Sequence, residues 1–577
     1  MADLSASASA SDQPSLSANT LQPLLLLCLA CLLLLVGLGG MGLTDRDEGS
    51  NAEAAREMLE TGDWISPTLN YEPRYAKPAF VYWIISSTYA LFGINEFTAR
   101  LPSAMFGIAL LILQYHFVNR VLGSTIALFS SLMLLLNPEF VGIHRMVLTD
   151  PELVFFTTLA TYSFWLGFSQ EGTDHRWMWG FYIGMGLAML AKGPVGIIIP
   201  LLAVIPYLTL TRQWRHYFTR GKPFAGWFLF IFIAAPWYIA MFAIHGADYA
   251  AAAQANTTGR FANPMEGHGG ILLFYIPVVL VGFFPWSGLL VVALYQQLQG
   301  WKKYWAGTRS GQDEDGLLLF CALWIVAILC FFTISATKLP HYILPLFPAA
   351  SLIAAVLWAR FLKEPEPRGL GVSLGILVFL GYLIGIALVS LPAIFETFRD
   401  KIAVEFPAAS QLGIGFTPMI AGTMLFVGVI AIRMTARNEN RRPVAFWISG
   451  GLIASLLVMI ILFPLPHFSK YFIEPPQKLA KIAGLNLGSD DHLIQFGRKR
   501  PSLSYYAQRK VHFLGPNDEK RLLDLVESGN LTMLILQEHL LARLPDKIAE
   551  FPVLLRSHGF VLLSSQSFIA PGDAATS

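Results

Sequence analysis

The sequence predicts an all-α polytopic membrane protein that carries a small α/β domain at its C-terminal end. Only 14% of the 577 residues are charged and 55% are hydrophobic, whereas about a quarter of the residues of a soluble globular chain are charged. Long apolar runs recur up to residue 463, and the composition then changes to that of a soluble domain. A formal net charge of +2, with no run of Lys or Arg, argues against nucleic acid as a partner.

The chain begins with a tail and a first apolar run. Residues 1–20 are rich in Ser and Ala and contain no basic residue, which predicts a disordered tail. The run Leu21–Leu43 is too long for the core of a signal peptide, and no basic segment precedes it. We therefore expect an uncleaved first membrane helix.

The region 21–463 is the predicted transmembrane domain. A membrane helix needs about 20 mostly apolar residues, and by that measure the region contains about thirteen helices. We expect them near 21–42, 98–118, 123–137, 151–168, 178–191, 194–210, 226–244, 271–296, 316–334, 342–360, 370–391, 414–432 and 444–463.

The basic residues predict the orientation of these helices. With the N-terminus in the cytoplasm, loops on the inner side hold most Lys and Arg residues, among them Arg212, Arg215, Lys302 and Lys303, as the positive-inside rule requires. An odd number of helices then places the C-terminal domain outside, on the same side as the first outer loop, 43–97. That loop breaks the rule because it is itself rich in basic residues.

Two interfacial helices are expected in the loop 43–97. Ser50–Glu60 has the pattern of a short amphipathic helix, with Glu53, Arg56 and Glu57 on a solvated face that forms local ion pairs. Phe80–Phe92 is apolar but too short to span a membrane, so we expect it to lie flat at the interface.

The predicted C-terminal domain occupies residues 464–577. Four prolines between Pro464 and Pro476 predict a linker, and short apolar segments with helical patterns between them predict an α/β domain. The expected strands are His492–Phe496, Val511–Leu514, Leu531–Leu536 and Phe560–Ser564, and the expected helices are Lys520–Glu527 and Gln537–Leu544.

Five groups of polar residues fall on the predicted outer side. They are Asp47-Glu48 with Lys77; Arg145 with Asp150; Lys192; Arg260 with Glu266 and His268; and Lys338 with His341 and Tyr342. Carboxylates combined with Lys, Arg and His donors suit a phosphate or pyrophosphate leaving group. A carboxylate such as Asp47 can accept a proton from an attacking hydroxyl or bind a divalent metal ion.

Each of these groups also has a purely structural interpretation. Asp150 precedes Pro151 and suits a helix cap. Lys192 could extend its ammonium to the membrane surface, and His268 could be a solvated loop residue. Lys338, His341 and Tyr342 could anchor the chain at the interface.

Six motifs carry a resemblance to a known family. In chain order they are RDEGSNAEAAREMLETGDWISP, YAKPAFVYW, LFG followed by ARLPSA, LTDPELVFF, LAKGPVG and SATKLPHYILPLFPA. Over residues 40–350 the sequence resembles the lipid-linked-sugar glycosyltransferases of the GT-C fold. The matching branch contains the bacterial aminoarabinose transferases (ArnT) and enzymes like dolichyl-phosphate-mannose–protein mannosyltransferase.

The resemblance implies an inverting transfer of a sugar from a polyprenyl (undecaprenyl) phosphate to a lipid, glycan or protein acceptor. The reaction would take place at the periplasmic face of a bacterial inner membrane. It implies catalytic carboxylates at Asp47, with Glu48 beside it, and at Asp150. Lys77 and Tyr342 match residues that hold the donor phosphate.

The donor phosphate site is expected to include further residues from the polar groups. These are Lys192, Arg260, Lys338 and His341. His268 matches a histidine that helps to hold a metal in the aminoarabinose branch, so Asp47 and His268 are the expected ligands of a divalent metal ion. One position departs from that branch: a glutamate precedes its Lys-Pro pair, where this chain has Ala76. We therefore expect a different sugar or acceptor.

Two other functions compete with sugar transfer. A transporter or flippase of polyprenyl-linked sugars would need charged residues distributed through the bilayer depth and broken helices that meet at the midplane. Here the ionisable residues gather at one side, which favours one-sided chemistry. A structural subunit of an envelope-assembly complex, with the α/β domain as its docking module, predicts no loss of function from changes at Asp47.

Overall fold

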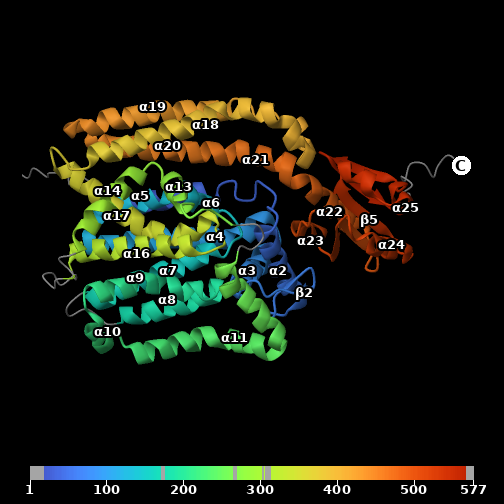
Figure 1. Ribbon diagram of the computed structural model, residues 1–577, viewed down its shortest axis with the longest axis horizontal. Helices are drawn as coiled ribbons and strands as arrows, with labels where there is room; N and C mark the ends of the chain where they lie inside the picture. Colours follow the sequence, from blue (N-terminus) through green and yellow to red (C-terminus); the bar gives the residue numbers. More distant parts are fainter. Residues whose placement is uncertain (1–17, 170–175, 264–268, 302–304, 306–312, 567–577) are drawn as a thin grey trace, which may run out of the picture.

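The computed structural model describes residues 18–169, 176–263, 269–301, 305 and 313–566. Most of the predicted tail, 1–17, lies outside these residues. Most helices form a bundle whose axes run along the long axis of the molecule, and a smaller domain with a β-sheet adjoins one end of the bundle (Figure 1). We refer to this end as the outer end.

The bundle contains a helix at each predicted apolar run, together with α6 and α10, which no run predicts. In chain order its helices are α1 (Ala18–Leu35), α4 (Glu96–Leu122), α5 (Ser124–Leu135), α6 (Pro138–His144), α7 (Asp150–Ser169), α8 (Trp177–Lys192), α9 (Val195–Leu210), α10 (Trp214–Arg220), α11 (Pro223–Gln254), α13 (Tyr275–Gly282), α14 (Ser287–Gln299), α16 (Glu314–Ile334), α17 (Phe347–Lys363), α18 (Leu370–Glu405), α19 (Thr417–Arg437) and α20 (Arg442–Leu462). Short segments join them: η1 (Ala255–Gly259), α12 (Arg260–Ala262), η2 (Pro340–Leu346), η3 (Pro407–Ser410) and η4 (Glu439–Arg441).

The predicted count of about thirteen spans is not confirmed. Over the described ranges, seven helices are long and apolar enough to cross a membrane, or up to nine if each of two bent pairs counts as one span. Helices α8 and α9 have 16 residues each, about 24 Å at 1.5 Å per residue, which is short for a hydrocarbon core of about 30 Å. Local hydropathy therefore placed the helices well but did not decide which of them span.

One predicted span is broken. The run 271–296 folds as α13 and α14, which meet at an angle of 119°. Pro285 lies in the break, where its ring removes a backbone donor and prevents the helix from continuing. The sequence signal was present, but an apolar run on both sides of a proline does not show whether the helix bends or ends.

The loop 43–97 folds as a compact cap on the outer end of the bundle. It contains α2 (Asp47–Thr61), the strands β1 (Thr68–Leu69) and β2 (Glu72–Pro73), and α3 (Phe80–Phe92). Helix α2 packs against α3, against β1 and against α23 of the C-terminal domain, and Figure 1 shows it between the bundle and that domain.

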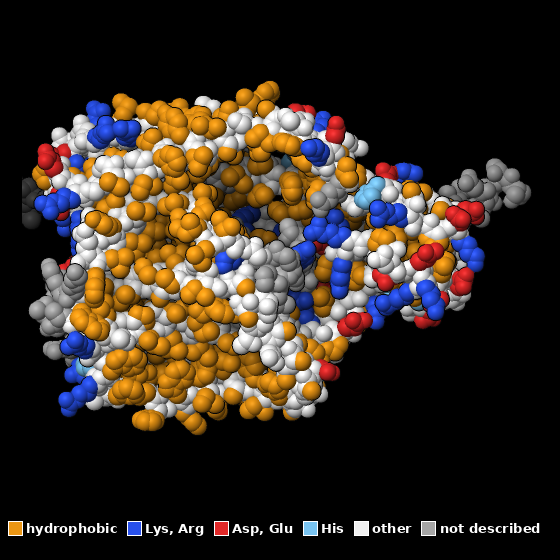
Figure 2. All heavy atoms as spheres, in the orientation of Figure 1, with side chains coloured by type: hydrophobic (Ala, Val, Ile, Leu, Met, Phe, Trp, Pro, Cys, Tyr) orange, Lys and Arg blue, Asp and Glu red, His pale blue; other side chains and the backbone are white. Residues whose placement is uncertain are grey.

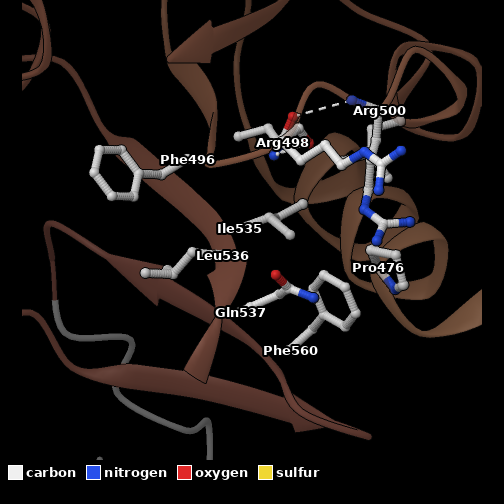
Figure 3. Close-up of a pocket in the computed structure, with 10 residues that line it drawn as sticks. Pro476, Phe496, Arg498, Arg500, Ile535, Leu536, Gln537 and Phe560 are labelled. Carbon is white, nitrogen blue, oxygen red and sulfur yellow. Dashed lines mark hydrogen bonds between the residues drawn. The ribbon is translucent and has the colours of Figure 1, made fainter. Parts of the chain in front are cut away.

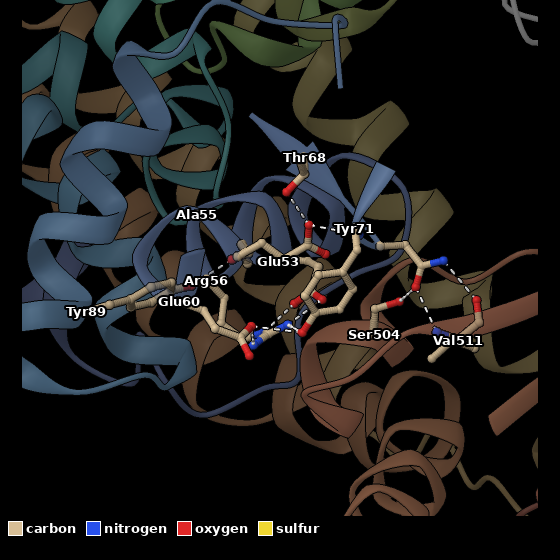
Figure 4. Close-up of polar contacts among 12 residues, drawn as sticks. Glu53, Ala55, Arg56, Glu60, Thr68, Tyr71, Tyr89, Ser504 and Val511 are labelled. Atoms are coloured by element: carbon tan, nitrogen blue, oxygen red, sulfur yellow. Dashed lines mark hydrogen bonds and ion pairs between the residues drawn. The ribbon is translucent and has the colours of Figure 1, made fainter. Parts of the chain in front are cut away.

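The prediction of a solvated charged face on α2 is wrong. Glu53 and Glu57 are 0% exposed and Arg56 is 4% exposed, because neighbouring elements cover this face. The expected local ion pair does form, since Arg56 Nε lies 2.7 Å from Glu53 Oε2. Arg56 Nη2 also donates to Tyr71 Oη, in the turn after β1, at 3.1 Å, and the Tyr71 backbone N–H donates to Glu57 Oε2 (Figure 4).

The C-terminal domain contains a five-stranded sheet in the order β4-β3-β5-β7-β6. Three predicted strands, β3 (His492–Phe496), β4 (Val511–Leu514) and β7 (Phe560–Ser564), have the predicted bounds, and β5 spans Thr532–Gln537. Strands β4, β3 and β5 are parallel, whereas β7 runs antiparallel to β5 and β6. Strand β6 (Val553–Ser557) was not predicted, because its half-exposed residues show no clear apolar alternation.

Helices cover both faces of this sheet. They are α22 (Glu474–Asn486), α23 (Ser502–Ala507), α24 (Glu519–Glu527), η6 (Glu538–Arg543) and α25 (Asp546–Ala549). The predicted proline linker is instead helical, as α21 (Pro464–Phe468), η5 (Ser469–Ile473) and the start of α22. Proline fits the first turn of a helix, and both Pro464 and Pro475 occupy such positions.

The surface supports a membrane-embedded bundle. In Figure 2 hydrophobic side chains cover most of the visible bundle, while basic side chains gather at the end opposite the C-terminal domain. The C-terminal domain instead mixes acidic and basic side chains, as a soluble domain does.

Candidate functional site

Asp47 begins α2 and its carboxylate is open to the surroundings. The side chain is exposed and makes no hydrogen bond or ion pair with the residues that the structure describes. The helix N-terminus favours a negative charge at this position. The residue before it, Arg46, has φ = 71°, a backbone conformation that residues with a side chain rarely adopt. An unpaired acid after a strained turn is a candidate reacting group.

Glu48, predicted to be catalytic beside Asp47, has a different environment. It is 1% exposed, and its two oxygens accept from Arg100 Nε at 2.7 Å and Nη2 at 3.0 Å. Backbone N–H groups of Thr44 and Val147 also donate to it. Burial alone would raise the pKa of Glu48, but Arg100 and these donors hold the pKa below its ordinary value. We therefore reassign Glu48 as a structural residue that ties α2 to α4.

Lys77 is a half-buried cation without a partner. It lies between β2 and α3, and its ammonium makes no hydrogen bond or ion pair within the described ranges. Burial lowers the pKa of Lys77 to about 8, and the nearby charge of Lys192 acts in the same direction. Asp47 and Asp150 oppose this shift, while Arg260 adds to it. Charges from four other segments thus converge on this ammonium.

Asp150 and Lys192 form the centre of this cluster. Lys192 Nζ, at the last residue of α8, lies 2.6 Å from Asp150 Oδ1, at the first residue of α7. The same ammonium lies 5.4 Å from the centre of the Tyr342 ring. The charges of Asp150 and Lys192 act on the neighbouring His341, as do those of Asp47 and Lys77. The structure therefore brings together residues from four of the five predicted polar groups.

Arg260 adds a further cation. It begins the short helix α12, and its Nε is buried without a hydrogen-bond partner among the described residues. Its charge acts on Lys77, so it belongs to the same cluster. A buried guanidinium N–H without an acceptor is costly, and an anionic ligand would satisfy it.

Lys338 does not join this cluster. It is buried, and its ammonium donates to the carbonyl oxygens of Thr333, at 2.8 Å, and Ser335. Both carbonyls belong to the C-terminal end of α16, where a lysine commonly caps unpaired carbonyl groups. The predicted role of Lys338 in holding the donor phosphate is thus not supported by its contacts. Arg145 likewise donates to the carbonyl of Leu33.

The predicted metal ligands can be assessed only in part. His268 and Glu266 lie outside the described residues, and Asp47 is described. Within the described part of the chain, no three His, Cys, Asp or Glu side chains group as metal ligands. Lys77, Lys192 and Arg260 supply positive charge that suits a phosphate.

Sequence reasoning missed two acids close to Asp150, the partly buried Glu139 in α6 and the buried Glu152 in α7. One carboxylate oxygen of Glu139 and both of Glu152 are buried without a hydrogen-bond partner among the described residues. It also assigned no role to Arg100, although this residue lies within the ARLPSA motif. The signal available for Arg100 was an arginine within an apolar helix, which is costly unless it is paired.

Comparison with known proteins finds similarity to glycosyltransferases. Residues 49–250 match the family described as dolichyl-phosphate-mannose-protein mannosyltransferase. An undecaprenyl phosphate-alpha-4-amino-4-deoxy-L-arabinose arabinosyl transferase of Edwardsiella ictaluri is 33% identical over 62% of this chain. That alignment spans 63% of the relative, which is less than two thirds of its length. A transferase of the same description from Pectobacterium atrosepticum is 28% identical over 94% of this chain and 98% of its own.

Solved structures also resemble this chain. ArnT from Cupriavidus metallidurans bound to undecaprenyl phosphate superposes with a TM-score of 0.76 at 22% sequence identity, covering 94% of this chain and 98% of the other. At this identity the likeness establishes the fold, and the expected GT-C fold with a small C-terminal sheet domain is confirmed.

Proposed function

We propose that this chain, a GT-C glycosyltransferase of the ArnT- and protein-mannosyltransferase-like family, transfers a sugar from a polyprenyl phosphate to an acceptor. One observation carries the proposal. An exposed carboxylate, Asp47, has no hydrogen-bond or ion-pair partner among the described residues and lies near Lys77. Lys77 in turn lies near Lys192, which is bound to Asp150 at 2.6 Å and lies over the Tyr342 ring. Such a cluster suits a substrate that carries a phosphate leaving group.

The cations stabilise the leaving group. As the bond between the sugar anomeric carbon and the phosphate oxygen breaks, negative charge grows on the lipid phosphate. Lys77 and Arg260, both without partners among the described residues, are placed to donate to it. Lys192 is held by Asp150, so it contributes charge at a fixed position and needs little reorganisation.

Asp47 acts on the attacking acceptor. An acceptor hydroxyl forms the new bond to the anomeric carbon and releases its proton to the Asp47 carboxylate, while the electron pair of the broken bond leaves with the phosphate. A single displacement of this kind inverts the anomeric configuration, which is the outcome that we propose.

The donor and the acceptor are inferred by class. The Edwardsiella and Pectobacterium relatives are named for a donor in which aminoarabinose is linked to undecaprenyl phosphate, and this supports a polyprenyl-phosphate-linked pentose or hexose. The acceptor is a hydroxyl of a lipid, glycan or protein. Because this chain has Ala76 where the aminoarabinose branch has glutamate, we retain the prediction of a different sugar or acceptor.

The orientation belongs to the same proposal. Basic side chains gather at the end of the bundle opposite the C-terminal domain (Figure 2), and the positive-inside rule assigns such an end to the cytoplasm. We therefore place the N-terminus in the cytoplasm, and the C-terminal domain and the cluster in the periplasm.

A divalent metal ion at Asp47 and His268 remains a prediction. A bound metal would add positive charge beside the leaving phosphate. Removal of metal ions with a chelator, followed by re-addition of Mg²⁺ or Zn²⁺, measures its contribution. Turnover that depends on re-addition would support the metal, and unchanged turnover would support a site that relies on its cations.

The decisive experiment has two parts. First, lipid-linked sugars that accumulate when the protein is removed from cells are identified by mass spectrometry. Second, the purified protein is reconstituted in vesicles, and the accumulated donor is supplied on the outer side only, with Asp47→Asn as the control. Transfer by the wild type but not by the variant supports the proposal. Movement of the donor across the membrane without transfer would instead identify a flippase.

A further inference from the structure

The C-terminal domain directly holds the segment that precedes Asp47. Asp45 accepts three hydrogen bonds from this domain: from Arg500 Nη1 at 3.0 Å, from the Ser502 backbone N–H at 3.2 Å and from Ser502 Oγ at 2.6 Å. Asp45 and Arg500 are 455 residues apart in the sequence. Their side chains are only 23% and 15% exposed, so water screens this ion pair less than it screens a surface pair.

Further contacts with the C-terminal domain hold the backbone before Asp45 and helix α2 after it. The backbone N–H of Leu43 donates to Tyr506 Oη at 3.0 Å, and Gln477 Nε2 donates to the Leu43 carbonyl at 2.6 Å. Gly49 approaches Ser502 so closely that a Cβ at residue 49 would lie 2.8 Å from Ser502 Cα. Helices α2 and α23 are therefore packed so closely at Gly49 that a side chain there would not fit.

Asp47 lies between two such anchors. On one side, Asp45 is bound to the C-terminal domain. On the other side, Glu48 is bound to Arg100 of the bundle. Arg46, between Asp45 and Asp47, has the unfavourable φ of 71°, a conformation that persists only when the surrounding contacts over-determine it. The two anchors supply these contacts and leave the Asp47 carboxylate itself unbound.

The C-terminal domain also holds the segment that leads to Lys77. Asn70, in the turn between β1 and β2, donates through Nδ2 to the Val511 carbonyl at 2.9 Å. Its Oδ1 accepts from the Val511 N–H at 2.8 Å and from Ser504 Oγ at 3.0 Å (Figure 4). Asn70 has φ = 60°, which asparagine tolerates better than most residues.

Arg500 is itself held rigidly within the C-terminal domain. It follows β3, and its backbone N–H donates to Gln495 Oε1 at 3.2 Å, while Gln495 Nε2 donates to the Arg498 carbonyl at 2.8 Å. The guanidinium lies 5.1 Å from the centre of the Phe560 ring. Figure 3 shows Arg500 and Phe560 in the same small pocket, at the ends of β3 and β5. The C-terminal domain therefore presents the Arg500 guanidinium to Asp45 in a fixed position.

We infer that the C-terminal domain is a positioning device for the reaction, in which Arg500 and Ser502 act through Asp45 to set the place of Asp47. The inference rests on the proposed function. It assigns a task to a domain none of whose described residues belongs to the cation cluster. Asn70 extends the same control to the segment before Lys77.

The test separates positioning from general stability. We compare Arg500→Ala, Arg500→Lys and Ser502→Ala with a matched control, Arg556→Ala, which breaks an exposed ion pair to Glu538 in the same domain. Misplacement of a reacting group by about 1 Å can cost about a hundredfold in rate. We therefore expect Arg500→Ala to lower kcat by about tenfold to a hundredfold, with little change in KM for the donor. Arg500→Lys, which keeps the charge without the fork of donors, should recover part of this loss.

A second readout does not depend on activity. Hydrogen–deuterium exchange in residues 43–50 should rise in Arg500→Ala and, to a smaller extent, in Ser502→Ala, but not in Arg556→Ala. Unchanged kcat and unchanged exchange in Arg500→Ala would overturn the inference, as would an equal loss of kcat in the control. If Arg500→Ala fails to fold, Ser502→Ala carries the test. If the wild type transfers no sugar, the proposed function fails, while the exchange experiment still decides whether the domain holds this segment.

Discussion

Asp47 and Glu48 are neighbours in the same helix, yet their surroundings are opposite. Asp47 is exposed and unpaired within the described residues, whereas Glu48 is buried and accepts hydrogen bonds from Arg100 and from backbone groups. The same contrast separates Lys77, which has no partner among those residues, from Lys338, which caps a helix. A charge whose hydrogen-bonding capacity is already used holds the fold, and a charge that keeps this capacity is free to meet a substrate.

The comparison extends to whole regions. The outer cap carries a paired network in which Arg56 donates to both Glu53 and Tyr71. Burial raises the pKa of Glu53 to about 7 despite the opposing effect of Arg56. The cluster around Lys77 instead combines the cations Lys77, Lys192 and Arg260 with the carboxylates of Asp47 and Asp150. A paired network in the same cap supports this partly paired site and helps to keep it in place.

The largest effect is expected for a change at Asp47, the exposed member of the pair Asp47 and Glu48. Asp47→Asn should lower kcat by about 10²- to 10⁴-fold, because a general base is lost. The melting temperature should change little, since the exposed carboxylate makes no contact with the described residues. Single-turnover assays and thermal unfolding in detergent measure the two effects. Turnover close to that of the wild type would remove Asp47 from the mechanism.

Glu48→Gln tests the buried member. The variant leaves Arg100 buried without its counter-charge, which costs about 3–5 kcal/mol of stability. We expect a clear fall in the melting temperature and in the amount of folded protein, with turnover per folded molecule reduced less than in Asp47→Asn. The double variant Glu48→Gln with Arg100→Gln is the control, because removal of both charges should restore part of the stability. A stable Glu48→Gln protein without turnover would return Glu48 to the catalytic residues.

Lys77→Ala tests the lysine that has no partner among the described residues, in contrast to Lys338, which caps a helix. Loss of one hydrogen bond to a charged group costs about 1.5–3 kcal/mol, so kcat/KM for the donor should fall by about tenfold to a hundredfold. Lys77→Arg should retain more activity than Lys77→Ala. Competition by a polyprenyl phosphate without sugar measures whether the phosphate is the group recognised, and equal inhibition of Lys77→Ala and wild type would contradict this role.

The smallest expected effect is a dependence on pH. Lys77 has a pKa of about 8, so its ammonium is charged below that pH and loses its proton as the pH rises through it. The value of kcat/KM, which reports the free enzyme, should therefore decline above about pH 8. Arginine keeps its charge throughout this range, so the decline should weaken in Lys77→Arg. A profile that is identical in both proteins would assign the decline to another group.

Much of the fold could be predicted from local patterns. Helix α3 and the strands β3, β4 and β7 have the bounds that the sequence predicted, because apolar periodicity and turn residues act over a few positions. The predicted helix count is not confirmed, since length alone does not decide whether a helix spans. The predicted proline linker is wrong, because proline fits the first turn of a helix and this segment is helical. Strand β6 was missed because its pairing with β7, rather than its own composition, makes it a strand.

The candidate site could be predicted only as a set of residue types. Motif comparison selected Asp47, Lys77, Asp150, Lys192 and Tyr342, and the grouping of polar residues on the predicted outer side added Arg260. The structure brings these residues together. It could not separate them from Glu48 and Lys338, which lie in the same motifs. It also gave no reason to connect Asp45 with Arg500.

The sequence by itself determined the class of this protein, a helical membrane domain followed by an α/β domain, and the residues from which a phosphate site could be built. Only the tertiary structure decided which of those charges are already paired. Glu48 meets Arg100 across 52 residues and Asp150 meets Lys192 across 42, and such pairs depend on how distant segments pack. Because burial and pairing decide whether a charged side chain stabilises the fold or remains open to a substrate, this part of the function became visible only in three dimensions.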